Sequence, residues 1–217
     1  VLKAGDGSNA DADVNAVANS HIKTGNEGFV TLGDGELNAF QASTLTLKTS
    51  GTGDITIDSV IDVSSATIGK LVLESGDDIT IAASGSLKAK ATHFKATDSV
   101  TINSDIETTS TTGDLIVDAN VGGAADADFI KFADGVSLTS KQHVELDGST
   151  HNDVFLQSLG SLTVKADDNI TIKGDLTATT AGATTKLYAD EAGNGGVLDI
   201  DKIDATARDL EFKGSNL

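Results

Sequence analysis

The sequence predicts an all-β fold, a parallel β-helix (β-solenoid) built from short strands. A polar turn followed by apolar–Thr–apolar recurs, and its clearest copies are Asp54-Ile55-Thr56-Ile57, Asp78-Ile79-Thr80-Ile81, Ser99-Val100-Thr101-Ile102 and Asn169-Ile170-Thr171-Ile172. Two apolar side chains flanking one Thr are typical of a strand with one buried face. The first three copies are spaced by 24 and 21 residues, which suits one coil of a solenoid. Stacked coils should therefore form ladders of Ile/Val inside and Thr outside.

The chain divides into a polar N-terminal cap or assembly segment, residues 1–28, and a β-solenoid repeat domain, residues 29–217. In the first segment, the near-helical spacing of Val14, Val17 and Ile22 predicts a short helix or an irregular cap over the first coil. From Phe29 onward, alternating apolar residues bounded by Gly, Asp, Asn and Ser predict strands. These strands are expected at residues 29–32, 36–40, 43–48, 53–58, 60–63, 66–73, 78–82, 86–90, 92–96, 99–103, 105–107, 114–118, 129–132, 135–139, 142–146, 153–157, 161–165, 169–173, 175–179, 185–189, 197–200 and 209–213. Loops are expected at residues 120–128, 180–184 and 190–196.

A β-sandwich of the pilin-like kind is the alternative architecture for many short strands. A sandwich ordinarily has hairpin turns, some buried aromatic residues and often Pro at edges and corners. This chain has 0 Pro, 0 Trp and only 4% aromatic residues. The composition and the repeat spacing therefore favour the β-helix, whereas antiparallel pairing and a swapped terminal strand would indicate the sandwich.

Composition excludes several classes of protein. The 15 basic and 33 acidic residues give a net charge of −18, which is opposite to what a nucleic-acid-binding surface needs. No apolar run approaches the roughly 20 residues of a membrane span, so no membrane insertion is expected. With 0 Cys, no disulfide or metal-thiolate site can form. The chain starts at Val1 rather than Met, which predicts a processed product or an excised segment.

The N-terminal segment contains a candidate calcium site, and calcium is the only cofactor that the sequence suggests. Asp11, Asp13 and Asn15 alternate like the first oxygen ligands of a calcium loop. An EF-hand would continue with Gly and Glu where this chain has Ala16 and Ile22, so only a site of another type fits. A solvated polar cap is the alternative interpretation.

A second candidate calcium site lies in the expected loop, where Asp126 and Asp128, with Asp134 nearby, carry ligands that a hard cation prefers. An ordinary surface loop is the alternative. More generally, stacked turns of so acidic a rod should repel each other, and divalent cations or high salt should stabilise it. The turn carboxylates expected to stack are Asp54, Asp78 and Asp114.

A carbohydrate-active β-helix enzyme, of the polysaccharide lyase or glycosidase class, is the alternative function. Such a site needs convergent carboxylates or basic residues that neutralise a uronate. The acidic residues here lie mostly in turns beside Gly or Ser, and the chain has a single Arg, Arg208, and a single Tyr, Tyr188. No catalytic or cofactor-binding residue is predicted, and a protein without enzymatic activity is favoured.

The sequence GSLTVKADDNITIKGDLT at residues 160–177 resembles the repeats of filamentous-haemagglutinin-type bacterial adhesins, and residues 53–63 and 71–90 are similar. The resemblance implies a right-handed parallel β-helix forming the shaft of a large surface or secreted protein. It does not extend to the secretion domain of that family, whose Asn-Pro-Asn motifs a chain with 0 Pro lacks. On this basis we expect an extracellular or cell-surface structural protein: an adhesin shaft, a filament or a surface-layer subunit. Host or matrix glycans are its candidate partners.

The last strand expected, residues 209–213, is followed by no recognisable cap. Either the chain continues or another copy covers this strand edge. We expect head-to-tail self-association with residues 1–28 as the donor, a contact that does not close and therefore grows a filament.

Overall fold

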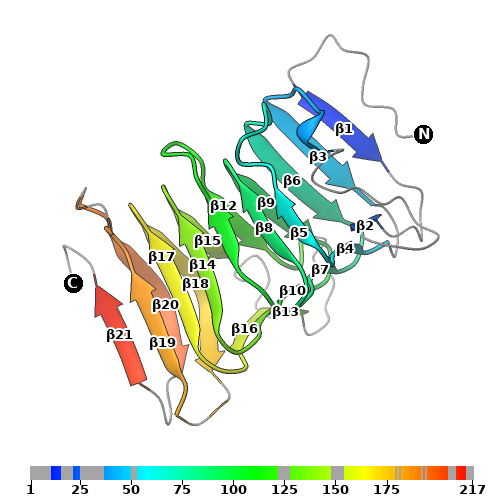
Figure 1. Ribbon diagram of the computed structural model, residues 1–217. Helices are drawn as coiled ribbons and strands as arrows, with labels where there is room; N and C mark the ends of the chain where they lie inside the picture. Colours follow the sequence, from blue (N-terminus) through cyan, green and yellow to red (C-terminus); the bar gives the residue numbers. More distant parts are fainter. Residues whose placement is uncertain are drawn as a thin grey trace.

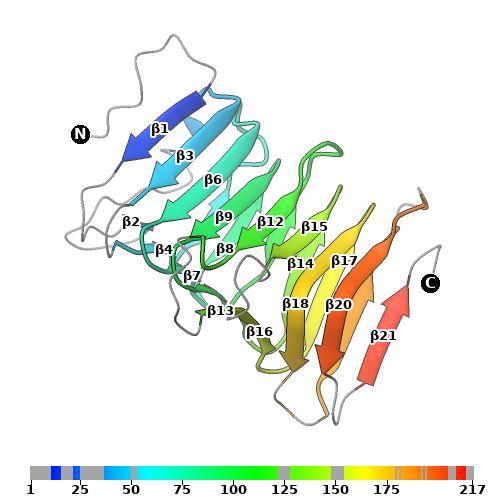
Figure 2. The ribbon, with the colours of Figure 1, turned by 180° about the vertical axis from the view of Figure 1, so that it is seen from behind.

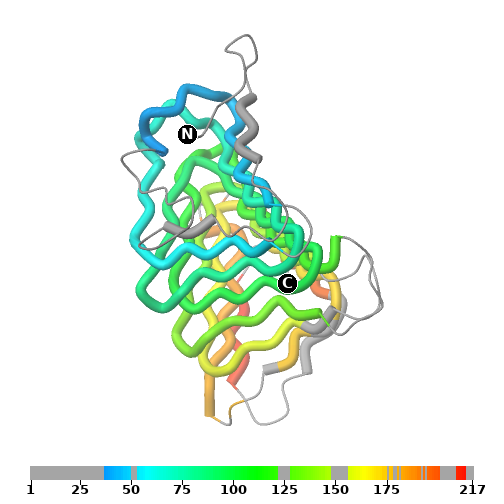
Figure 3. The backbone as a smooth tube through the Cα atoms, turned by 90° about the vertical axis from the view of Figure 1, so that its right-hand side faces the viewer, coloured from blue at the N-terminus to red at the C-terminus, as the bar shows by residue number. Residues whose placement is uncertain are grey.

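The computed structural model describes residues 11–15, 22–24, 37–49, 53–121, 128–147, 154–178, 180, 182–191, 193, 195–204 and 209–213. Over these residues the protein is all-β, and its strands coil into an elongated solenoid with β1 and β21 at opposite ends (Figures 1 and 2). Successive coils are stacked one on another (Figure 3). All pairings between the described strands are parallel, which confirms the β-helix and excludes the sandwich.

The strands form three ladders, one along each face of the solenoid. The first ladder contains β1 (Asp11–Asn15), β3 (Thr44–Lys48), β6 (Lys70–Ser75), β9 (Thr92–Ala96), β12 (Leu115–Asp118) and β15 (Val144–Asp147). The second contains β2 (Ile22–Thr24), β4 (Ile55–Ile57), β7 (Ile79–Ile81), β10 (Val100–Ile102), β13 (Asp128–Phe132) and β16 (Val154–Ser158). β18 (Ile170–Ala178) pairs with both β15 and β16, so the first two ladders join there. β20 (Leu198–Asp204) pairs with β18. The third contains β5 (Val60–Asp62), β8 (Ser86–Ala89), β11 (Ile106–Thr108), β14 (Val136–Ser140), β17 (Leu162–Ala166), β19 (Thr184–Tyr188) and β21 (Asp209–Lys213).

The repeat spacing read from the sequence is the register of the second ladder. Ile55 pairs with Ile79, and Ile79 pairs with Val100, so the offsets of 24 and 21 residues each correspond to one coil. Thr56, Thr80 and Thr101 pair in the same way and lie half-buried on the outer side. The predicted Thr ladder is therefore confirmed.

The core is a narrow apolar column that runs the length of the rod. The apolar residues of the four repeat copies are all buried, at 3% exposure or less: Ile55, Ile57, Ile79, Ile81, Val100, Ile102, Ile170 and Ile172. Leu115 and Val117, the alternate apolar residues of the strand expected at 114–118, are 0% exposed. Phe94 and Phe132 are the largest fully buried side chains in the described part of the core. Such a thin interior, filled by aliphatic residues, agrees with the low aromatic content of the chain.

The N-terminal segment contains strands where the sequence predicted a helix or an irregular cap. β1 pairs with β3 and β2 pairs with β4, so both continue the ladders of the solenoid. The prediction of a helix through Val14 and Ile22 is wrong, because both residues belong to strands. Pairing with the next coil outweighs the weak local helical pattern, as tertiary context often does.

Other strand boundaries differ from the prediction for local reasons. Residues 37–39 form a helical turn rather than a strand, closed by a hydrogen bond from Phe40 N to Leu37 O (3.2 Å). The strand expected at 66–73 begins only at Lys70, because Ala66 N donates to Val63 O (3.1 Å) in a turn. The strands expected at 169–173 and 175–179 are one strand, β18, with a register shift between Ile172 and Asp175. The strand expected at 29–32 lies outside the described residues.

Candidate functional site

The corners of the solenoid, where one ladder turns into the next, hold most of its polar chemistry. At the corner between the first and second ladders, Asp78 N donates to Asp54 Oδ1 (3.2 Å) and Ser99 N donates to Asp78 Oδ1 (2.9 Å). Phe129 N then donates to Ser99 Oγ (3.0 Å). Each side-chain oxygen thus accepts a backbone N–H of the following coil, which satisfies donors that the strand ladders leave unpaired.

The other two corners repeat this arrangement. Between the second and third ladders, Ser137 N donates to Asp105 Oδ1 (2.8 Å) and Ser161 N donates to Asp134 Oδ1 (2.7 Å). Between the third ladder and the first, Val197 N donates to Asn169 Oδ1 (2.7 Å). We call these three columns of side-chain acceptors the corner ladders. They give Asp54, Asp78, Asp105 and Asp134 a structural role.

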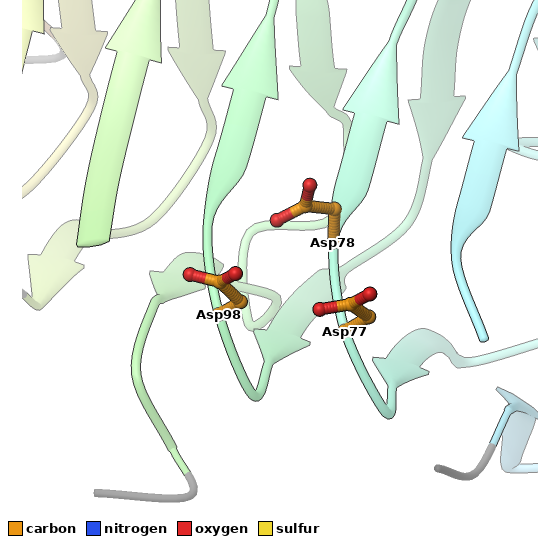
Figure 4. Close-up of side chains that lie close together, drawn as sticks. All are labelled: Asp77, Asp78 and Asp98. Carbon is orange, nitrogen blue, oxygen red and sulfur yellow. The ribbon is translucent and has the colours of Figure 1, made fainter. Parts of the chain in front are cut away.

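The first corner also contains a cluster of three carboxylates. Asp77, Asp78 and Asp98 each place an oxygen within 4.8 Å of the others (Figure 4). Asp98 N donates to Asp77 O (3.2 Å), so the cluster spans two successive coils. Asp77 and Asp98 each lie two positions before the second-ladder strand of their own coil, which explains why they occupy equivalent places in neighbouring coils.

Burial and mutual repulsion make this cluster costly when it is fully charged. Burial, followed by the charges of Asp54 and Asp98, raises the pKa of Asp77. Burial also raises the pKa of Asp78, where the hydrogen bond from Ser99 N opposes the effect and the neighbouring carboxylates add to it. Both shifts have the direction expected for carboxylates that repel one another at this corner.

We predict that Asp77→Asn raises the melting temperature at pH 7 and low salt. The folded-state pKa of Asp77 lies above its unfolded value, so its charge destabilises the fold at neutral pH. This cost disappears as the pH falls through the raised pKa, and the advantage of the variant should shrink over that interval. Salt should shrink it as well, by screening the repulsion. Thermal unfolding monitored by circular dichroism, at several pH values and salt concentrations, measures both effects.

A matched control for Asp77→Asn is Asp62→Asn on β5. Ser64 donates hydrogen bonds to the Asp62 carboxylate and holds the pKa of Asp62 below its usual range. The charge of Asp62 therefore stabilises the fold at pH values above its unfolded-state pKa. This contribution is lost as the pH falls through the lowered folded-state pKa. The two substitutions should therefore shift the melting temperature at pH 7 in opposite directions. An Asp77→Asn protein that melts below the wild type at pH 7 would show that repulsion is not the dominant effect at this corner.

The first candidate calcium site lies on β1. Asp11, Asp13 and Asn15 occupy β1, in register with Thr44, Thr46 and Lys48 of β3, and their side chains lie outside the described residues. The calcium site proposed for them stays a prediction.

The second predicted calcium segment is only partly described. Asp126 lies outside the described residues. Asp128 is not in a loop but begins β13, where it is 1% exposed, and Asp134 follows the other end of that strand in the corner ladders. Asp128 and Asp134 therefore lie beside different corners.

Sequence reasoning found Asp54 and Asp78 at one corner but assigned Asp114 to the same stack and missed the rest of the cluster. Asp114 precedes β12 at the corner between the third and first ladders, so it does not join Asp54 and Asp78. Asp77 and Asp98 could have been predicted to lie together. They are 21 residues apart, the same offset that relates Ile79 to Val100.

The flat faces carry ion pairs between neighbouring coils. Lys173 bonds to Glu145 and, at 2.9 Å, to Asp147, and these contacts, with that of Glu145 the larger, raise the pKa of Lys173. On the third ladder, Lys88 Nζ lies 3.1 Å from Glu107 Oε2. Exposed pairs of this kind contribute little stability each, but in register they form charge ladders along the rod.

The described residues line two shallow hollows on these faces. One, of about 340 Å³, lies at the first corner and is lined by Lys48, Glu74 and Lys95 among others. The other, of about 300 Å³, lies on the third ladder beside Asp62, Asp105 and Glu107. The three carboxylates of the second hollow are all engaged: Asp62 with Ser64, Asp105 with Ser137 N, and Glu107 with Lys88.

Comparison with protein-family models, with curated proteins and with solved structures found no match. Within the described ranges, no helix has the length and apolar character that crossing a membrane requires. The fold and the corner geometry are therefore the basis for a functional proposal.

Proposed function

We propose that this protein is a structural or adhesive β-solenoid shaft without catalytic activity, displayed outside the cell. The observation that supports it best is the use of the corner carboxylates. Asp54, Asp78, Asp105 and Asp134 accept backbone N–H groups from the next coil, so they hold coils together instead of facing a substrate. A rod built this way is suited to spanning distance and to presenting regular faces.

Adhesion or self-association is the activity that such faces support. Thr56, Thr80 and Thr101 form one polar column, and coil-to-coil ion pairs such as Lys88–Glu107 form others. Polar columns of this kind offer hydroxyl and charged groups at the regular spacing of strands, about 4.8 Å, which suits extended glycans or another rod. The resemblance of residues 160–177 to the repeats of adhesin shafts supports this role.

The competing function is a carbohydrate-active enzyme, and the hollow beside Asp62, Asp105 and Glu107 is the observation that favours it. A general acid at neutral pH needs a raised pKa, whereas the pKa of Asp62 is lowered by Ser64. The lining also holds no aromatic residue on which a sugar ring could stack.

Incubation of the purified protein with acidic and neutral polysaccharides, with and without calcium, separates the two functions. We expect no new reducing ends and no unsaturated uronate absorbance, together with retention of the protein on at least one immobilised glycan or on itself. Depolymerisation that is abolished by Asp105→Asn, in a variant that still melts as a folded protein, would establish the enzyme instead. Asn keeps the oxygen that accepts Ser137 N, so this substitution tests the charge rather than the corner bond.

A further inference from the structure

The outer side of the third ladder carries two columns of side chains whose order the strand registers fix. The first column is Asp62, Lys88, Glu107, Thr139, Lys165, Tyr188 and Lys213, and the second is Val60, Ser86, Asp105, Ser137, Thr163, Lys186 and Glu211. Four basic and four acidic residues stand in these columns, so this face is neutral in a chain of net charge −18. Two copies of the chain can therefore approach through it without the repulsion that the chain as a whole produces.

The charges of the first column are complementary to the same column in reverse order. Thr139 on β14 is the midpoint, with Glu107 one coil to one side and Lys165 one coil to the other. Two coils from the midpoint, the corresponding residues are Lys88 and Tyr188. Reversing the column about Thr139 therefore opposes the Glu107 carboxylate to the Lys165 ammonium group and the Lys88 ammonium group to an aromatic ring, both favourable contacts.

The outermost pair and the second column follow the same rule. Asp62 and Lys213, each three coils from β14, carry opposite charges. Reversing the second column about Ser137, also on β14, opposes Asp105 to the hydroxyl group of Thr163. Neither column opposes two like charges.

The relief of the face has the same relation to β14. The hollow of about 300 Å³ on the third ladder includes Ser86 and Lys88 of β8, two coils to one side of β14. Tyr188, the single Tyr of the chain, stands on the outer side of β19, two coils to the other side. The same reversal therefore places the largest outward side chain of the two columns over the hollow.

The central pair of opposite charges remains accessible within one copy. Glu107 Oε2 lies 3.1 Å from Lys88 Nζ, and the two side chains are still 44% and 41% exposed. Since a carboxylate has two oxygens, Glu107 can keep Lys88 and accept a further ammonium group. The Lys165 ammonium group lies 5.6 Å from the centroid of the Tyr188 ring, a contact that leaves its charge without neutralisation.

We propose that two rods associate side by side and antiparallel through their third ladders. The twofold axis passes through β14 along the strand direction, which makes each column face its own copy in reverse order. Glu107 of each copy then bonds to Lys165 of the other, and Tyr188 of each enters the hollow of the other. Such a contact is isologous, so it closes as a dimer.

The size of the face sets the expected affinity. Seven strands spaced by about 4.8 Å, each about four residues wide, give roughly 30 Å by 15 Å, on the order of 450 Å² for each copy. Because this is below the roughly 800 Å² per partner of a stable complex, we expect dissociation constants on the order of 10–100 μM and a marked loss of affinity with salt. Packed sheets are inclined by about 30°, so opposition is closest at β11, β14 and β17.

The first ladder lacks this self-complementarity about its own middle. One of its outer columns runs through Glu74, Lys95, Asp118 and Asp147. Reversal between β9 and β12 opposes Glu74 to Asp147, two carboxylates. Head-to-tail association, expected from the sequence, stays a separate prediction that would give a filament rather than a dimer. The dimer rests on the proposed structural role in that the partner is another shaft.

Charge reversal at the central pair tests the arrangement. Glu107→Lys and Lys165→Glu each replace both central opposite-charge pairs of the dimer by like-charge pairs, so each variant alone should dimerise at least about tenfold more weakly than the wild type. An equimolar mixture of the two variants restores both pairs and should form a heterodimer of nearly wild-type affinity. The chain that carries both substitutions should regain self-association for the same reason. Sedimentation velocity, with the two variants carrying different fluorophores, measures all of these species.

A second pair of variants tests the hollow. Tyr188→Ala removes the ring that fills it and should weaken dimerisation, whereas Tyr188→Phe keeps the ring and should leave dimerisation close to that of the wild type. Both variants lose the hydroxyl group that bonds to Glu211, so a difference between them reports the ring alone. Equal affinities for these two variants would contradict the proposed docking of Tyr188.

Lys70→Glu, on β6 of the first ladder, is the control for changed net charge and should leave dimerisation unchanged. Far-ultraviolet circular dichroism verifies that each variant is folded. The proposal is overturned if the wild type stays monomeric up to millimolar concentration, or if its mass grows beyond a dimer with concentration. It is also overturned if the mixture of variants fails to restore association. A monomeric rod would leave the shaft function standing, whereas polysaccharide cleavage would refute that function without bearing on the dimer.

Discussion

Replacing Ile81 with Ala is expected to lower the free energy of unfolding by about 2–5 kcal/mol. Ile81 is 0% exposed and stands in register between Ile57 of the preceding coil and Ile102 of the following one. Both neighbours are fixed by strand pairing, so the interior cannot collapse into the space left by the missing atoms. Chemical denaturation with urea, monitored by circular dichroism, measures the loss.

Thr80→Ala is the matched control for Ile81→Ala, because Thr80 lies on the same strand and faces outward. Its cost should stay below about 1 kcal/mol, the range of strand preferences at a partly exposed site. Equal losses for the two variants would mean that the inward column is not the source of stability. Because the coils are coupled to their neighbours, unfolding should be fitted with a repeat model as well as a two-state one.

Replacing Gly85 with Ala should destabilise the protein by about 1–3 kcal/mol through overpacking. A Cβ at this position would lie 2.4 Å from the carbonyl oxygen of Ile57 in the preceding coil. That oxygen belongs to backbone and accepts a hydrogen bond from Ala82 N (2.8 Å), so it cannot move away without loss of the bond. The melting temperature should fall by several degrees, at about 2–4 °C for each kcal/mol.

Ala83→Ser, two residues earlier in the same turn and exposed, controls for a small added group at this corner. It should change the melting temperature little, because surface substitutions of this size are usually within about 0.5 kcal/mol. A Gly85→Ala protein as stable as the wild type would show that the two coils do not approach closely at this corner. The glycines at Gly69, Gly113 and Gly196 face backbone oxygens of the preceding coil in the same way.

The class of fold was predictable from the sequence because the alternating pattern and its spacing report the same geometry. Ile-Thr-Ile sets one buried face, and the offset from Ile55 to Ile79 sets the length of a coil. What the pattern lacked was information about corners. Whether residues 63–69 extend a strand or turn depends on the hydrogen bond from Ala66 N to Val63 O, which no periodicity reveals.

The acidic cluster shows a similar division between what could and could not be predicted. Turn carboxylates were expected to stack, and Asp54 and Asp78 do so. Asp114 has the same local context of Gly followed by Asp but belongs to a different corner, because coil length varies and the sequence does not say on which face a turn lies. β1 and β2 were missed because their polar sequence has a weak helical spacing, which pairing with β3 and β4 outweighs.

The corner ladders give the rod a direction. In every one of the hydrogen bonds named for them, the acceptor side chain belongs to the earlier coil and the donating N–H to the later one, as from Ser99 N to Asp78 and from Val197 N to Asn169. At the corners named above, a finished coil therefore presents side-chain acceptors on the side where the next coil will lie. We expect the coils to fold in order from the N-terminal end, each coil serving as the template for the next. A protein that emerges from a ribosome or a secretion channel with its N-terminal end first would then fold without waiting for the rest of its length.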